Sequence, residues 1–280
     1  MKYILYNPNS KNGNTLDEIN NQYLSIDDVT KINVLDKETY NNCIHSLTND
    51  DTIIIIGGDG TLNHFVNDVK DLNITAKILF NTAGTGNDFY NDVKDNEDGS
   101  LIEVNKYIKS LPKAIINGKE YLFINGIGFG IDGFCCEEGD RLQRKSTKPV
   151  NYTAIAIKGC LFKYKAPRGK VTVDGVTKEY KRIWLAPTMK GRFYGGGMNI
   201  APEQNRLAED NSVTSVVWHK SSRLKTLMIF PSVFKAEHTK YTKYIEIVKA
   251  HHTIVEFDRP TALQIDGETV SGVTKYEVIA

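Results

Sequence analysis

The sequence predicts two domains of different class: an α/β domain with a parallel sheet over residues 1–124, and an antiparallel β-sandwich over residues 125–280. Over the first 125 residues, short apolar segments rich in β-branched residues alternate with segments of helical periodicity, an order typical of a parallel sheet covered by helices. Beyond about residue 120, strand-like segments follow one another, and Asp-Gly turns separate several of them. The length of 280 residues also fits about two domains.

In the first domain, residues 52–56 (TIIII) are typical of a strand that is covered on both faces. Leu62, Phe65, Val66 and Val69 recur at helical spacing and would form one apolar helix face. In chain order, the predicted strands are residues 2–6, 31–35, 52–56 and 76–80, and the predicted helices are residues 15–23, 39–47 and 62–72.

In the second domain, Asp174-Gly175 and Asp266-Gly267 indicate tight turns between strands. The predicted strands are residues 119–125, 170–173, 181–186, 213–218, 244–249, 253–257 and 261–265, and the predicted helices are residues 152–164 and 222–235. No low-complexity linker separates the domains, so we expect the boundary at a short crossover near Asn125.

The composition excludes several classes of protein. Hydrophobic residues make up 40% and charged residues 25%, and no apolar segment approaches the roughly 20 residues of a membrane span. Four cysteines without CxxC spacing predict reduced thiols rather than disulfides or a zinc site. The N-terminus reaches Asn7 and Pro8 too early to hold a secretory apolar core, so we expect a cytoplasmic protein.

Charge is distributed unevenly along the chain. Residues 1–140 carry 11 basic and 22 acidic side chains, whereas residues 141–280 carry 24 basic and 12 acidic ones. Residues 141–200 alone hold 14 basic and 2 acidic side chains, which would attract an anionic surface, although a solvated face would show the same pattern. No RNA-binding aromatic signature, zinc-finger spacing or heptad repeat accompanies this segment, so nucleic acid is not an expected partner.

Two glycine-containing loops each follow a predicted strand of the first domain. Residues 57–63 (GGDGTLN) end the strand at 52–56, and residues 81–89 (NTAGTGNDF) end the strand at 76–80. Glycine lets the backbone approach a phosphate closely, and a helix N-terminus offers N–H groups and the positive end of its dipole. Neither loop is a Walker P-loop or a dinucleotide GxGxxG motif, and together they predict two walls of one nucleotide site. Residues 6–10 (YNPNS) would form a third piece of that wall.

These residues resemble the diacylglycerol kinase catalytic domain family, which includes bacterial lipid kinases and sphingosine kinases. The matching pieces are residues 6–10, 57–63, 84–89 (GTGNDF) and 266–268 (DGE), with a weaker piece at 195–197, 201–202 and Asp210. The resemblance spans essentially the whole chain. It implies a Rossmann-like α/β domain of the NAD kinase and diacylglycerol kinase kind, a C-terminal β-sandwich, and an active site in the cleft between them.

The resemblance also implies ATP and Mg²⁺ as cofactors and assigns roles to residues. The nucleotide-binding residues it implies are Asn7, Ser10, Gly57, Gly58, Asp59, Gly60, Thr61, Leu62, Asn63 and Thr85. Glu268 would be the base that takes the proton from a lipid hydroxyl, while Asp59 and Asp88 would organise magnesium and water at the reacting phosphate. Both roles suit phosphoryl transfer, which needs positioned groups and cations against the phosphate charge.

A second, structural Mg²⁺ is implied at a loop of the second domain. It would be held by the Asp210 side chain and by the backbone carbonyls of Leu207 and Ser212. The family segment usually reads Asp-Gly-x-Leu-Asp, whereas this chain has Asp210-Asn211-Ser212-Val213-Thr214, in which the second acid is missing. Asn211 tolerates the left-handed backbone that glycine would supply there.

The leading hypothesis is therefore a lipid kinase that phosphorylates diacylglycerol or a related lipid in phospholipid metabolism. It would bind the inner, anionic membrane surface peripherally through residues 141–200, and its oligomeric state stays open, a homodimer included. One alternative is a soluble NAD kinase-like enzyme, which shares a Gly-Gly-Asp-Gly loop. Another is a nucleotide-binding regulatory protein without turnover, against which Asp59, Asp88 and Glu268 argue.

Overall fold

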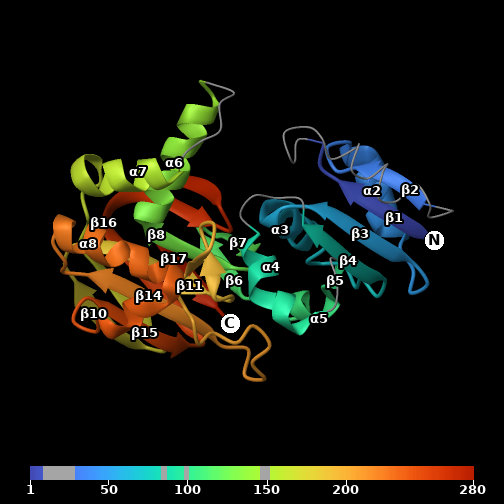
Figure 1. Cartoon of the computed structure of the whole chain (residues 1–280). Helices are drawn as coiled ribbons and strands as arrows, with labels where there is room; N and C mark the ends of the chain where they lie inside the picture. Colours follow the sequence, from blue (N-terminus) through green and yellow to red (C-terminus); the bar gives the residue numbers. More distant parts are fainter. Residues whose placement is uncertain (9–28, 83–86, 98–100, 146–151) are drawn as a thin grey trace. The chain divides into compact units, whose positions relative to one another are not determined.

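The computed structural model describes residues 1–8, 29–82, 87–97, 101–145 and 152–280. It divides into two compact units, Met1–Ser110 and Leu111–Ala280. The elements of the first unit are β1 (Lys2–Tyr6), β2 (Val29–Asn33), α2 (Lys37–Ser46), β3 (Thr52–Gly57), α3 (Asp59–Asp68), β4 (Lys77–Thr82), α4 (Asp88–Val93), η2 (Lys94–Asn96), β5 (Leu101–Glu103) and α5 (Asn105–Ile108), and Figure 1 shows their arrangement. The helix predicted at residues 15–23 lies outside the described residues.

The first unit is built on a five-stranded sheet in the order β2-β1-β3-β4-β5. The pairs β1–β2, β1–β3 and β3–β4 are parallel, which confirms the predicted α/β class, and β5 adds an antiparallel edge that was not predicted. The central strand β3 is covered on both faces, since Ile53, Ile54, Ile55 and Ile56 are each at most 4% exposed. The carboxyl ends of these parallel strands are where α/β sheets bind ligands.

The second unit, Leu111–Ala280, is an antiparallel β domain with helices. Its elements are β6 (Lys113–Ile116), β7 (Lys119–Leu122), β8 (Gly126–Gly130), α6 (Ile131–Gln143), α7 (Tyr152–Lys158), η3 (Gly159–Lys163), β9 (Gly169–Val173), β10 (Val176–Tyr180), β11 (Ile183–Met189), β12 (Phe193–Tyr194), β13 (Met198–Asn199), β14 (Val213–His219), α8 (Arg223–Ile229), η4 (Phe230–Lys235), η5 (Glu237–Lys240), β15 (Ile245–Ala250), β16 (His252–Ile265) and β17 (Glu268–Ile279).

The main sheet of the second unit runs in the order β15-β14-β11-β8-β16-β17-β6-β7, and β9 joins it through β16. Its pairs are antiparallel, as predicted. The long strand β16 changes register after Glu256. Its first half pairs with β9 and its last three residues pair with β8, so one strand serves two parts of the sheet. Residues 111–124, which we expected in the first domain, carry β6 and β7, and β6 pairs with β17.

Strand β8 and helix α6 were missed by the sequence analysis, and glycines explain why. β8 reads GIGFG, a composition with low strand propensity. A Cβ on Gly128 would lie 2.7 Å from the Pro187 Cα of β11, so glycine lets these strands pack closely. A Cβ on Gly133 of α6 would lie 2.3 Å from the backbone oxygen of Ala262. Close packing, rather than local propensity, therefore requires these glycines.

Candidate functional site

The glycine loop of the first unit forms the junction between β3 and α3. Helix α3 begins at Asp59, three residues before the predicted start, so Gly60 and Thr61 belong to its first turn. Gly58 is its N-cap and has no side chain to satisfy the first N–H groups. A Cβ on Gly57 would lie 2.3 Å from the Thr61 Oγ1, so the chain needs glycine at the end of β3. The result is a helix N-terminus with an uncapped, positive end, which suits an anionic ligand.

Asp59 joins this loop to the second predicted loop. Its Oδ2 accepts a hydrogen bond from the backbone N–H of Asp88 at 2.8 Å, and its Oδ1 accepts one from the N–H of Phe89 at 3.0 Å. The N–H groups belong to the first turn of α4, whose N-cap, Asn87, is left-handed with a φ of 48°. Asp59 thus caps α4 from a different helix and holds Asp88, which is 6% exposed, beside it. The structure brings together the two acids that sequence reasoning had singled out.

A pocket of about 290 Å³ opens beside the glycine loop. Asn7 and Thr61, both predicted to bind a nucleotide, line it together with Tyr40, His64 and Asp68. The pocket also reaches residues 34–35, to which the sequence analysis had assigned no role. Asn7 follows β1 and Thr61 follows β3, so the pocket lies at the carboxyl ends of adjacent parallel strands.

The remaining predicted residues of this unit divide into two groups. Leu62 and Asn63 are buried in α3, at 0% and 6% exposed, so the Leu62 side chain packs in the core. Ser10 and Thr85 lie outside the described residues.

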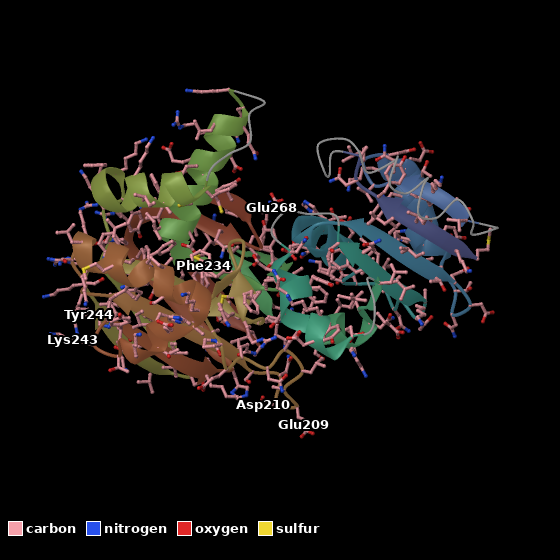
Figure 2. All side chains as sticks on the ribbon, viewed as in Figure 1. Glu209, Asp210, Phe234, Lys243, Tyr244 and Glu268 are labelled. Carbon is pink, nitrogen blue, oxygen red and sulfur yellow. The ribbon has the colours of Figure 1, made fainter. Side chains whose placement is uncertain are left out.

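In the second unit, Asp266 and Gly267 form the two-residue turn between β16 and β17. Their φ angles of 46° and 90° are both positive, the pattern of a type I′ hairpin. The Asp266 carboxylate accepts hydrogen bonds from the backbone N–H groups of Ile124, Asn125 and Gly126 at 2.6, 2.8 and 2.9 Å. Glu268 is the first residue of β17 and is exposed at this anchored turn; Figure 2 shows its position. The turn therefore presents an accessible carboxylate on a fixed backbone.

A buried polar cluster near this turn was missed by the sequence analysis. It consists of Asp132 in the first turn of α6, Tyr194 of β12 and Gln264 of β16. The Asp132 carboxylate, the Tyr194 hydroxyl and the Gln264 side-chain amide are buried together, and Tyr194 and Gln264 hydrogen-bond to Asp132. Buried polar groups are nearly always hydrogen-bonded, and these three side chains satisfy one another in part. Burial raises the pKa of Asp132 to about 7.

The buried polar cluster and Glu268 lie near the same stretch of α6. Burial raises the pKa of the Cys136 thiol to about 12, and the charges of Asp132, Asp140 and Glu268 raise it further. Asp132, Cys136 and Asp140 follow one another at one-turn intervals on α6, and Glu268 is close enough to this face to raise the pKa of the thiol. The sequence signal that could have found the cluster is the Gly130-Ile131-Asp132-Gly133 segment, in which glycines flank a buried acid.

The predicted loop-metal residues Leu207, Asp210 and Ser212 lie together before β14. Leu207 is 46% exposed, whereas Ser212 is 2% exposed. The Oδ2 of Asp210 lies 2.7 Å from the Lys249 Nζ. Figure 2 shows Asp210 on a loop well separated from Glu268 in this view, so this loop is not part of the Glu268 turn.

Exposed apolar side chains gather on two neighbouring segments of the second unit, α8 and η3. Leu224 and Met228 of α8 are 71% and 73% exposed, and Phe162 of η3 is 77% exposed. Arg223 and Lys225 of α8 and Lys163 of η3 add positive charge. We call this set of six residues the α8–η3 surface. No helix in the described ranges is both long and apolar enough to span a bilayer.

Two family models match successive parts of the chain and divide it between residues 119 and 125, a little after the end of the first compact unit at Ser110. Residues 2–119 match the model of the diacylglycerol kinase catalytic domain, and residues 125–278 match that of the YegS C-terminal NAD kinase beta sandwich-like domain. These matches confirm the family resemblance and the predicted fold class.

Individual relatives are distant in sequence. The chain is 23% identical to "Putative lipid kinase YtlR" of Bacillus subtilis over 81% of its own length and 76% of that protein. It is 24% identical to a diacylglycerol kinase of Mycobacterium tuberculosis over 68% of its own length and 62% of that protein. A crystal structure from Bacillus anthracis strain Sterne, described as "a putative diacylglycerol kinase", superposes with a TM-score of 0.71 at 20% identity, covering 99% of this chain and 91% of that one.

Proposed function

The chain belongs to the family in which a diacylglycerol kinase catalytic domain is joined to a YegS-type β-sandwich-like domain, and on this premise we propose that it is an ATP-dependent lipid kinase. It would transfer the γ-phosphoryl group of ATP to the hydroxyl of diacylglycerol or a related lipid. The observation that carries the proposal is the Asp59 carboxylate, which joins the glycine loop to the first turn of α4 and so supports a site built from both.

In the proposed site, the first unit holds the nucleotide. The phosphates would lie against the N-terminus of α3, where Gly57 and Gly58 leave room for close approach. Asn7 and Thr61 line the adjoining pocket and would hydrogen-bond the nucleotide. These groups position the triphosphate, which is the main requirement of phosphoryl transfer.

Asp59 and Asp88 fit a magnesium ion bound together with phosphate. Within the described residues, no three His, Cys, Asp or Glu side chains form a cluster able to hold a metal, so two carboxylates would need phosphate and water as further ligands. Mg²⁺ prefers such coordination by one or two carboxylates together with phosphate and water. Each Asp59 oxygen accepts one N–H and keeps a lone pair for a metal-bound water. Mg²⁺ would neutralise phosphate charge there.

The second unit would supply the base and the acceptor pocket. Glu268 is exposed on an anchored turn, as a carboxylate must be to accept a proton from a substrate hydroxyl. The buried polar cluster holds hydrogen-bond donors and acceptors beside this turn, which suit the remaining polar groups of a lipid headgroup.

We also propose that the lipid is met at an anionic membrane surface, with the protein peripheral to it. The predicted basic segment at 141–200 is partly neutralised, because Arg141 and Lys163 lie within 4 Å of Glu138, and Lys170 pairs with Glu179. The α8–η3 surface extends this region with exposed apolar side chains between basic ones. Apolar insertion together with basic attraction is the usual form of peripheral membrane binding.

A lipid panel tests the proposal. The protein would be incubated with γ-labelled ATP, Mg²⁺ and detergent micelles that contain diacylglycerol, ceramide, sphingosine or phosphatidylglycerol, and the product identified by mass spectrometry. Labelled lipid supports the proposal. Labelled NADP⁺ from NAD⁺ without detergent would favour the NAD kinase-like alternative, and nucleotide binding without any product would favour a regulatory protein.

A further inference from the structure

The loop that the family resemblance assigns to a structural Mg²⁺ carries a different set of contacts in this chain. Three oxygen donors were expected there: the Asp210 carboxylate and the carbonyls of Leu207 and Ser212. Two of these three groups already accept hydrogen bonds from protein donors. The fit of a cation can therefore be judged from the donors around each oxygen.

Asp210 is held by a lysine from the neighbouring strand. The Lys249 Nζ of β15 lies 2.7 Å from the Asp210 Oδ2, and the His251 Nε2 lies 3.6 Å from the same oxygen. The hydrogen bond from Lys249 is the main cause of the lowered pKa of Asp210. Both partners are exposed, at 62% and 42% of their side chains, so this pair alone would contribute little stability.

A buried hydrogen-bond chain satisfies Ser212. The Gln204 Nε2 donates to the Ser212 carbonyl at 2.9 Å, and the Thr214 hydroxyl donates to the Gln204 Oε1 at 2.6 Å. Ser212, Gln204 and Thr214 are all 7% exposed or less. Thr214 stands where the family pattern has its second Asp, and it lies directly opposite Lys249 in the β14–β15 pairing. A neutral hydroxyl and a cationic neighbour thus replace an anion at this position.

A second lysine holds the turn between these residues. Lys190 is 1% exposed, and its Nζ donates to the Asn211 Oδ1. Asn211 is left-handed, with a φ of 54°, as expected where the family has glycine. Burial lowers the pKa of Lys190 to about 8, and the charge of Arg206, which is 6% exposed, lowers it further. Asp210 is thus paired with Lys249, and the buried Lys190 is close enough for Asp210 to raise its pKa, so two cations already neutralise this carboxylate and disfavour a third.

We infer that this loop binds no divalent cation. The ammonium group of Lys249 and the buried Gln204–Thr214 hydrogen bonds hold the loop in place of the expected metal. The inference concerns stability and metal binding, so it stands apart from the proposed kinase activity. It explains why the second acid of the family pattern is absent: an acid at 214 serves to hold a metal, whereas Thr214 serves to hold Gln204.

Thermal unfolding of the full chain without nucleotide tests the inference. The melting temperature would be compared in EDTA and in about 5 mM Mg²⁺, for the unsubstituted protein and for Asp210→Asn. We expect any response to Mg²⁺ to be the same in both proteins within about 1 °C, since the loop binds none. A rise of several degrees that disappears in Asp210→Asn would overturn the inference.

A double variant tests the role of Lys249. Thr214→Asp with Lys249→Met restores the second acid and removes the competing ammonium, so it should gain a rise in melting temperature of several degrees with Mg²⁺. The matched control is Thr214→Asp with Lys275→Met, which removes an exposed lysine of β17 and keeps Lys249; it should gain no response. The role given to Lys249 would be overturned if the folded Thr214→Asp, Lys249→Met protein showed no rise in melting temperature with Mg²⁺. An equal rise in the control would overturn it too. If the double variant does not fold, the Asp210→Asn comparison decides alone.

Discussion

Asp59 accepts the backbone N–H of Asp88 through its Oδ2 at 2.8 Å, so the two acids assigned to the reacting phosphate are joined by a hydrogen bond. The same carboxylate also accepts the N–H of Phe89. Asp59 therefore caps α4, and in the proposed site its remaining lone pairs would hold a metal-bound water. Substitutions can separate these tasks, because amide and carboxylate differ in charge but share one acceptor oxygen.

We expect Asp59→Asn to lower turnover by at least about 10²-fold, because the site loses an anion that organises the metal-bound phosphate. The fold should survive, with a loss of about 0.5–2 kcal/mol in the free energy of unfolding, because one of two capping contacts is kept. Asp59→Ala should cost more stability and lose as much activity. Asp71→Asn, an exposed acid of the same unit, is the control. Full activity in Asp59→Asn would contradict the assigned role.

Glu268→Gln should lower turnover by about 10²–10⁴-fold, the range usual for removal of a general base. The melting temperature and the affinity for ATP should stay unchanged, because Glu268 is exposed and lies in the unit that is not expected to bind ATP. Glu120→Gln changes a carboxylate that is 55% exposed in the same unit and should leave turnover unaltered. Unchanged turnover in Glu268→Gln would remove the base assignment.

Asp266→Ala should destabilise the second unit by about 2–4 kcal/mol, because three backbone N–H groups lose a charged acceptor. The left-handed backbone at this position adds strain for alanine, whereas Asp266→Asn tolerates it and keeps one acceptor, so it should cost less. Urea unfolding followed by tryptophan fluorescence suits this measurement, because both tryptophans, Trp184 and Trp218, lie in the second unit. Equal stability of the two variants would argue against the anchoring role of the carboxylate.

The sequence was informative where local pattern and tertiary role agree. Residues 52–56 combine β-branched composition with full burial, so β3 was predicted at its observed start. The start of α3 was predicted three residues too late, because glycine has a low helix propensity. Gly60 nevertheless lies in the first turn of the helix. Asp59 and Asp88 were singled out through the family resemblance, and the structure joins them by a hydrogen bond, while their roles stay predictions.

The sequence failed where packing decides. β8 and α6 contain glycines, which have low strand and helix propensity. The reason for these glycines is their close packing against Pro187 and Ala262, which are distant in the sequence. The buried polar cluster was missed because its members come from α6, β12 and β16 and show no common spacing. The Lys249–Asp210 pair was missed similarly, since only the β14–β15 register brings Lys249 opposite Thr214.

Replacing both Leu224 and Met228 by serine should weaken binding to anionic vesicles by about 10-fold or more, because each large apolar side chain contributes about 1.5–3 kcal/mol when fully buried. Turnover on short-chain lipid in detergent should not change, because no membrane insertion is needed there. Vesicle sedimentation measures the first quantity. Val176→Ser, which removes an apolar side chain that is 65% exposed on β10, is the control. Equal binding of all three proteins would place the membrane surface elsewhere.

Asp132 predicts a dependence of stability on pH. Its pKa is raised by burial to about 7, whereas an aspartate in an unfolded chain titrates near 3.9. Between about pH 4 and pH 7 the folded state therefore holds a proton that the unfolded state has lost, so the contribution of Asp132 to stability falls as pH rises through this window and is constant above it.

Asp132→Asn removes this titration and should make the protein more stable than the unsubstituted chain at pH 8, by an amount on the order of a few kcal/mol. The difference should shrink towards pH 5, where Asp132 is already neutral in the folded state. Melting temperatures at pH 5, 6.5 and 8 measure it, and Asp258→Asn, an exposed acid of β16, should show no such trend. A difference that does not vary with pH would mean that Asp132 stays in one ionisation state across the window, and the buried polar cluster would then be a fixed structural feature.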